Sequence, residues 1–149
     1  MTRPGRRLNL TGAAADTRRY AWADERDESG VTLREHFRRL MQHATLTLAE
    51  LYVGAGEVEN AIDLYREASE ADPGDDRAWR ALFQLHASRG DLPSLMREDR
   101  RLRALLRDLA VQAGEGPQSV ASEPSVELQQ EYQRLMATIE KPREAASAG

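Results

Sequence analysis

Hydrophobic residues recur at steps of three and four positions from residue 32 onward. The first such stretch runs from Thr32 to Gly54, and this spacing predicts an amphipathic helix whose apolar face turns to a core. Thr32 and Glu35 form a capping box at its start, and Gly54 and Gly56 end it. The predicted apolar face consists of Leu33, Phe37, Leu40, Met41, Ala44, Leu48, Leu51 and Tyr52.

Four further helices follow the same rule. They are expected at about 58–71, 76–88, 93–109 and 125–140. Asp72-Pro73-Gly74 ends the first of these, because the residue before a proline is pushed out of helical geometry. Gly90 closes the next, and Ser125 is placed to cap the last. No stretch alternates with a period of two, so the predicted fold class is all-α.

Residues 1–19 are rich in arginine and show no apolar period, which predicts a flexible basic arm. Tyr20 and Trp22 precede an acidic run and are interpreted as anchors of this arm on the body. Residues 112–124 contain glycine, proline and serine and predict a mobile loop. The small, polar segment 142–149, which starts at Pro142, predicts a disordered tail.

An internal repeat joins the middle helices. Gly56 and Gly90 lie 34 positions apart, the period of the tetratricopeptide repeat. The chain resembles that family most clearly in a first unit at 42–75. The matching positions there are Leu48, Tyr52, Gly56, Ala61, Tyr65, Ala68 and Pro73.

The second unit, at 76–109, matches the family through Trp79, Leu82 and Gly90 and then departs from it. Leu95 replaces a small residue, Asp99 an aromatic one and Arg107 the proline. This degenerate unit is expected to cap the stack, with helix 125–140 covering its open face. The predicted architecture is therefore a set of tetratricopeptide-like antiparallel helix pairs, an α-α superhelix, with a C-terminal capping helix.

Several short segments resemble a particular tetratricopeptide-like family, the bacterial transcriptional activator domain of actinobacterial antibiotic regulatory proteins. The ending is the most specific of them, because members finish with a short E-L-G-V-E-P-S turn and a tyrosine-bearing helix. Asp108–Val111 and Glu123–Ser125 resemble that turn, split by an insertion at 112–122, and Tyr132 follows. The other segments are Tyr20-Ala21-Trp22, Leu48–Tyr52, Ala71–Pro73, Trp79–Leu82, Gly90-Asp91 and Arg101–Leu106.

This resemblance covers about residues 20–141 and implies a role in transcriptional regulation through contacts with a partner protein or a neighbouring domain. The family's module follows a winged helix-turn-helix domain, and the segment before Tyr20 is too short to form one. The chain is therefore expected either to be a fragment of a larger regulator or to act without binding DNA directly.

The composition of the chain limits its expected ligands and location but indicates no catalytic group. The 149 residues carry a net charge of −4, which gives no reason to expect binding to nucleic acid or an anionic membrane. Cysteine is absent, which fits a reducing cytoplasm and excludes disulfides and thiolate metal sites. No apolar run approaches the length of a transmembrane helix.

Candidate catalytic groups do not converge in the sequence. His36 and His43 are two turns apart on one helix, too far for a metal-binding pair, and His86 is interpreted as a half-buried packing residue. The carboxylates near Arg66 suggest a solvated face, and the run from Arg97 to Arg103 is mixed in sign. No phosphate-binding loop or nucleophile motif appears. We therefore expect no enzyme, no cofactor and no metal.

What remains is an interaction surface. In tetratricopeptide stacks the first helix of each pair lines a concave groove, and two arginines there could hold a carboxylate of a partner. Leu46 is expected to be exposed in this groove. A stack of two units also has an open end that pairing with a second copy would bury. The alternative function is a scaffold in an assembly unrelated to transcription. The predicted groove residues are His43, Leu46, Glu50, Arg77, Arg80 and Gln84.

Overall fold

The computed structural model describes Arg26, residues 30–116 and residues 118–148, with only the backbone given for 141–148. These residues form five α-helices and one short 3-10 helix, and apart from an isolated bridge between Arg26 and Thr32 they contain no β-structure. The all-α prediction is confirmed. Two compact units divide the chain, residues 1–41 and residues 42–149. The elements are α2 (Leu33–Gly54), α3 (Val58–Ala71), α4 (Asp76–Ser88), α5 (Leu92–Gln112), η3 (Val120–Ser122) and α6 (Val126–Ala148).

In the first unit, the predicted capping box begins α2. The Thr32 backbone N–H donates to Glu35 Oε2 at 3.0 Å, and the Glu35 N–H donates to Thr32 Oγ1 at 3.1 Å. The hydrogen bond from the Thr32 backbone lowers the pKa of Glu35. The predicted basic arm at 1–19 and the anchors Tyr20 and Trp22 lie outside the described residues.

Two equivalent glycine caps give the repeat its period. Gly56 has φ 79° and Gly90 has φ 65°, the left-handed conformation that ends a helix without a Cβ clash. The N–H after each glycine reaches back five residues: Glu57 N–H donates to the Tyr52 carbonyl and Asp91 N–H to the His86 carbonyl, both at 2.9 Å. The shared cap turns the chain in the same way after α2 and after α4.

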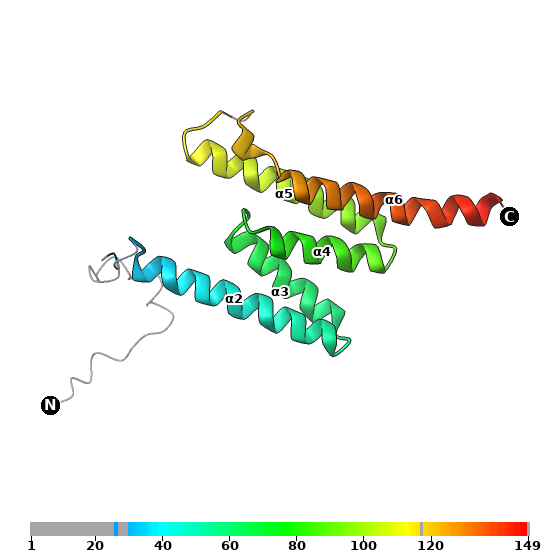
Figure 1. Cartoon of the computed structure of the whole chain (residues 1–149), viewed down its shortest axis with the longest axis horizontal. Helices are drawn as coiled ribbons and strands as arrows, with labels where there is room; N and C mark the ends of the chain where they lie inside the picture. The colour runs from blue at the N-terminus through cyan, green and yellow to red at the C-terminus, as the bar shows by residue number, and fades with distance from the viewer. Residues whose placement is uncertain (1–25, 27–29, 117, 149) are drawn as a thin grey trace. The chain divides into compact units, whose positions relative to one another are not determined.

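In the second unit, α3, α4 and α5 are stacked in chain order, and α6 packs back against α4 beside α5 (Figure 1). α4 contacts α3 on one side and both α5 and α6 on the other. Trp79 at the centre of α4 is fully buried, and its indole N–H donates to the Pro73 carbonyl at 3.0 Å. Ala61 and Ala68 are buried where α3 packs closely, as predicted, and Tyr132 of α6 lies 5.5 Å from the Phe83 ring.

The predicted inward face of α2 is wrong for its large residues before Tyr52, whereas Tyr52 packs against the core as predicted. The buried residues of α2 are Leu46 and Ala49. The large side chains expected to face the core are instead between 44% and 65% exposed; these are Leu33, Phe37, Leu40, Met41, Leu48 and Leu51. Within the second unit, Leu46 and Ala49 belong to the core cluster together with residues of α3 and α4.

The predicted loop at 112–124 is partly ordered against the stack. It contains η3, and Ser122 and Pro124 are buried. Ser125 caps α6 as predicted, since its Oγ accepts from the Leu128 N–H at 3.2 Å. The same hydroxyl donates to Asp76 Oδ2 at 2.6 Å and so fixes the start of α6 to the start of α4.

The structure continues α6 through Pro142 to Ala148, into the segment 142–149 that the sequence predicts as a disordered tail. Proline is unfavourable inside a helix because it lacks an N–H and its ring crowds the preceding turn. The alanines at 145, 146 and 148 have the highest helix propensity of any residue and favour the helix on the far side of Pro142.

We expect Gly90→Ala to lower the free energy of unfolding by about 1 kcal/mol, because an L-residue is strained at this positive φ. Urea denaturation followed by circular dichroism measures the change. Gly116→Ala is the matched control, since Gly116 has no positive φ and open space around it. Equal stability of the two variants would contradict the cap.

Candidate functional site

A small hollow of about 170 Å³ lies within the second unit, on the side formed by the first helices of the two repeat units. Its walls come from the C-terminal half of α2, from α3 and from α4. The lining residues are His43, Leu46, Thr47, Glu50, Tyr65, Arg77 and Ala81. The site combines an apolar floor with exposed charged groups at its rim.

The structure brings four of the six predicted groove residues together here: His43, Leu46, Glu50 and Arg77. Leu46 was expected to be an exposed contact, and this is wrong, because it is only 5% exposed. It packs in the core and forms part of the floor. Tyr65, which sequence reasoning treated only as a packing residue, also lines the hollow. Burial and then the charge of Glu50 raise the pKa of its hydroxyl, which therefore stays a hydrogen-bond donor.

Arg80 and Gln84 are not among the lining residues. Gln84 Nε2 donates to Glu131 Oε1 of α6 at 3.1 Å. The charge of Arg80 acts on the same carboxylate and helps to lower the pKa of Glu131, after the hydrogen bonds from Arg134 and Gln84. Both residues thus act on Glu131 of the capping helix α6 and not on the hollow.

Arg77 at the rim is already paired. Its Nε and Nη2 donate to the two oxygens of Asp75 at 2.9 and 2.8 Å, while its side chain remains 60% exposed. Asp75 also caps α4 through the Arg77 N–H and accepts from Gln42 Nε2 at 3.2 Å. The hydrogen bond from Arg77 is the main cause of the lowered Asp75 pKa. The rim therefore holds an ordered acid–arginine pair rather than a lone cation.

A second polar cluster lies inside the stack, centred on Glu98 of α5, whose side chain is 2% exposed. Glu98 Oε1 accepts from Arg66 Nε of α3 at 2.9 Å, and Oε2 accepts from Arg101 Nη2 at 2.8 Å. His86 Nε2 of α4 lies 3.5 Å from Oε1. Burial alone would raise the Glu98 pKa, but the contacts with His86, Arg101 and Arg66 outweigh burial and lower it to about 2.

Arg101 extends this cluster, which we call the Glu98 clamp (Arg66, His86, Glu98 and Arg101). Its guanidinium stacks over the Trp79 ring at 4.4 Å, and its Nη2 donates to Ser69 Oγ at 2.8 Å. Ser69 itself is fully buried. One arginine of α5 thus contacts α3 and α4 at the same time.

The Glu98 clamp was not predicted from the sequence. The carboxylates near Arg66 and the charge run in α5 were interpreted as solvated, and His86 as half-buried, whereas His86 and Glu98 are both buried. A signal was present, because Glu98 lies three residues after Leu95 and four before Leu102, on the apolar side of α5.

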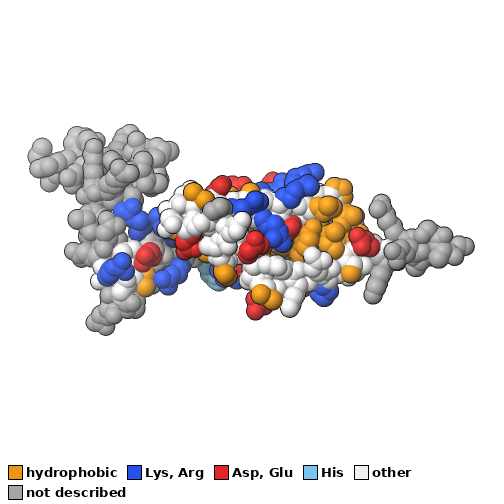
Figure 2. Space-filling view, turned by 90° about the horizontal axis from the view of Figure 1, so that it is seen from above, with side chains coloured by type: hydrophobic (Ala, Val, Ile, Leu, Met, Phe, Trp, Pro, Cys, Tyr) orange, Lys and Arg blue, Asp and Glu red, His pale blue; other side chains and the backbone are white. Residues whose placement is uncertain are grey.

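The α5–α6 side of the stack carries interspersed charge (Figure 2). Arg103 pairs with Glu123 at 3.0 Å, and Arg134 with Glu131 at 2.7 Å. Among the described residues, no group of three or more histidines or carboxylates is placed to hold a metal ion. No helix in that part of the chain is long and apolar enough to cross a membrane.

The fold is that of a tetratricopeptide-like all-α protein. In agreement with the geometry, the tetratricopeptide repeat family matches residues 42–85. This match covers α3 and most of α4 together with the half of α2 that lines the hollow. No curated protein and no solved structure matches the chain. Tetratricopeptide repeats serve as protein-interaction scaffolds, so the chain carries a module of that non-catalytic kind.

The pH dependence of stability tests the Glu98 clamp. The folded pKa of about 2 lies below the ordinary 4.5, so ionised Glu98 contributes stability above pH 4.5 that is lost as the pH falls towards 2. The difference corresponds to about 3 kcal/mol. We expect Glu98→Gln to lower the free energy of unfolding by this order at pH 7 and to flatten its pH dependence below pH 5.

Urea denaturation at a series of pH values measures both effects. Glu67→Gln is the control, because Glu67 is an exposed carboxylate of α3. Parallel pH profiles for wild type and Glu98→Gln would contradict the assignment.

Proposed function

We propose that this chain is a non-catalytic protein–protein interaction module of a bacterial transcriptional regulator, acting in the cytoplasm. The observation that carries the interaction role is the hollow on the inner side of a matched tetratricopeptide repeat. Its volume of about 170 Å³ suits one side chain of a partner segment, not a large ligand. The partner is another protein or a neighbouring domain.

The chemistry of the hollow favours a partner side chain with an apolar body and a polar end. Leu46, Ala81 and the Tyr65 ring offer apolar contact, while Glu50 and the Asp75–Arg77 pair surround the opening. Because Asp75 already neutralises Arg77, binding by a bare carboxylate of the partner is less favoured than the sequence suggested. Hydrogen bonding to the paired groups sets orientation, and the buried body supplies affinity.

The transcriptional context is supported by the resemblance of the chain's segments to the bacterial transcriptional activator domain. Two of those segments, Arg101–Leu106 and Glu123–Ser125, have structural roles here. Arg103 pairs with Glu123, and Ser125 caps α6 and donates to Asp76. The alternative function, a scaffold in an assembly unrelated to transcription, uses the same hollow and differs only in the identity of the partner.

Filling the hollow tests the interaction role. We expect Ala81→Phe to reduce partner binding at least tenfold, because the added ring occupies the space for the partner's side chain. Ala104→Phe, the same change at an exposed position of α5, is the matched control. Isothermal titration against the identified partner gives the Kd values, and unchanged binding by a folded Ala81→Phe variant would reject the hollow as the docking site.

A photo-crosslinking amino acid at position 81, compared with one at 104, identifies the partner in cells. Selective recovery of an RNA polymerase subunit or a DNA-binding regulator at position 81 supports the transcriptional role. Selective recovery of components of another assembly would replace it with the scaffold function.

A further inference from the structure

We propose that the hollow, in the docking role proposed above on which this step rests, receives a basic side chain of the partner, lysine or arginine. The groups that select this chemistry all belong to the second unit. Glu50 and Thr47 of α2 supply hydrogen-bond acceptors to the occupant. Leu46 of α2 and Ala81 of α4 supply apolar contact for its aliphatic stem.

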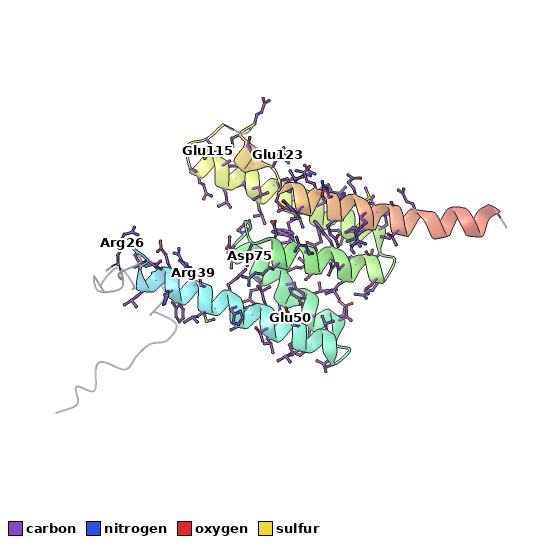
Figure 3. The ribbon with its side chains drawn as sticks, in the orientation of Figure 1. Arg26, Arg39, Glu50, Asp75, Glu115 and Glu123 are labelled. Atoms are coloured by element: carbon purple, nitrogen blue, oxygen red, sulfur yellow. The ribbon has the colours of Figure 1, made fainter. Side chains whose placement is uncertain are left out.

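Glu50 is an acidic group that remains open to a partner. Its side chain is exposed, and it lies one helical turn after Leu46 on the same side of α2. Within the part of the chain that the structure describes, Glu50 forms no hydrogen bond and no ion pair. Figure 3 shows Glu50 on α2 and Asp75 at the start of α4, so the two acids come from different helices. The Glu50 carboxylate is therefore available to a group that arrives from outside.

The other charges at the opening do not neutralise Glu50. Arg77 donates to both oxygens of Asp75, at 2.9 and 2.8 Å, so these two charges cancel each other. The hydrogen bond with Asp75 is the main cause that raises the pKa of Arg77, and the charge of Glu50 contributes as well. With His43 counted as neutral, Glu50 leaves the opening negatively charged. This charge repels an incoming carboxylate and attracts a cation.

The loss of water from Glu50 on binding favours a cation over a neutral group. A segment that fills the hollow covers the opening and displaces water from this carboxylate. An ionised group that loses its water without an opposite charge beside it is destabilised. A neutral amide or hydroxyl of the partner offers only a hydrogen bond. An ammonium or guanidinium group offers a hydrogen bond and the opposite charge together.

The hydroxyl of Thr47 also favours a hydrogen-bond donor. Thr47 Oγ1 donates to the His43 carbonyl at 2.8 Å, so its oxygen is left to accept from an occupant. The charged ends of lysine and arginine carry donors and no acceptor. Their aliphatic stems can lie along Leu46 and Ala81 while the charged end turns to Glu50 at the rim.

n-Butylammonium, which reproduces the side chain of lysine, tests this selectivity on the full chain. Nuclear magnetic resonance titration follows the backbone amide signals of Thr47 and Ala81, two residues that line the hollow. We expect n-butylammonium to bind about threefold more tightly than butan-1-ol, which has the same stem without a charge, and pentanoate to bind most weakly. Equal affinities of the cation and the alcohol, or tighter binding of pentanoate, would overturn the proposal.

Glu50→Gln and Glu67→Gln separate the charge at the hollow from the overall charge of the chain. Each variant removes one exposed carboxylate, but Glu67 lies on α3 outside the lining of the hollow. Glu50→Gln is expected to reduce the affinity for n-butylammonium to that for butan-1-ol, and Glu67→Gln to leave it unchanged. An equal loss in the two variants would show nonspecific attraction to the chain and reject Glu50 as the binding group.

Binding of the partner recovered by photo-crosslinking at position 81 distinguishes this proposal from the docking role itself. We expect Glu50→Lys to weaken that binding about tenfold, as Ala81→Phe does, because the new charge repels a basic side chain. If Ala81→Phe abolishes binding and Glu50→Lys leaves it unchanged, the docking role stands and the basic occupant is rejected. If a folded Ala81→Phe variant binds as wild type does, the docking role fails as well.

Discussion

The second repeat unit depends on one buried carboxylate. Glu98 of α5 accepts hydrogen bonds from arginines of α3 and of its own helix and contacts His86 of α4. Such a cluster is stable only while all its members are present, because removing one leaves a buried charge without compensation. It also explains how α5 stacks correctly although it lacks the repeat's usual residues, with Leu95 and Asp99 at positions where the family has a small and an aromatic residue. The contacts of Glu98 with Arg66 and His86 fix the register of α5 against α3 and α4, which apolar packing alone would define less well.

α2 has two apolar sides, one buried and one exposed. Its narrow apolar side, with Leu46 and Ala49, completes the core and supplies the floor of the hollow. Its broader apolar side lies opposite and is exposed. The two sides are separated by polar residues such as His43, which lines the hollow.

The helix starts and the ends of α2 and α4 were predictable because local chemistry sets them: the Thr32–Glu35 capping box, the glycine caps and the Ser125 cap depend on neighbours in sequence. The ends of α5 and α6 lie beyond the predicted ones. The buried side of α2 was not predictable. The fold buries Leu46 and Ala49, whereas the side with more large apolar residues is exposed. Four of the predicted groove residues line the hollow, whereas Arg80 and Gln84 lie outside its lining, and Gln84 bonds to Glu131 of α6, a contact that the repeat register does not include. The Glu98 clamp joins residues of α3, α4 and α5. It could not be predicted because the sequence around Glu98 does not show which residues of the other helices contact it.

A strongly shifted pKa often marks an active site, and Glu98 has the largest shift among the described groups. Here the shift has a structural cause. Both carboxylate oxygens accept hydrogen bonds from arginines, and the side chain is 2% exposed, so no substrate reaches it. The accessible groups at the hollow are of the opposite kind: Arg77 is paired with Asp75, and the Tyr65 hydroxyl stays protonated. In the described part of the chain, the Glu98 pairing therefore stabilises the packing of the helices, and the accessible polar groups lie at the hollow.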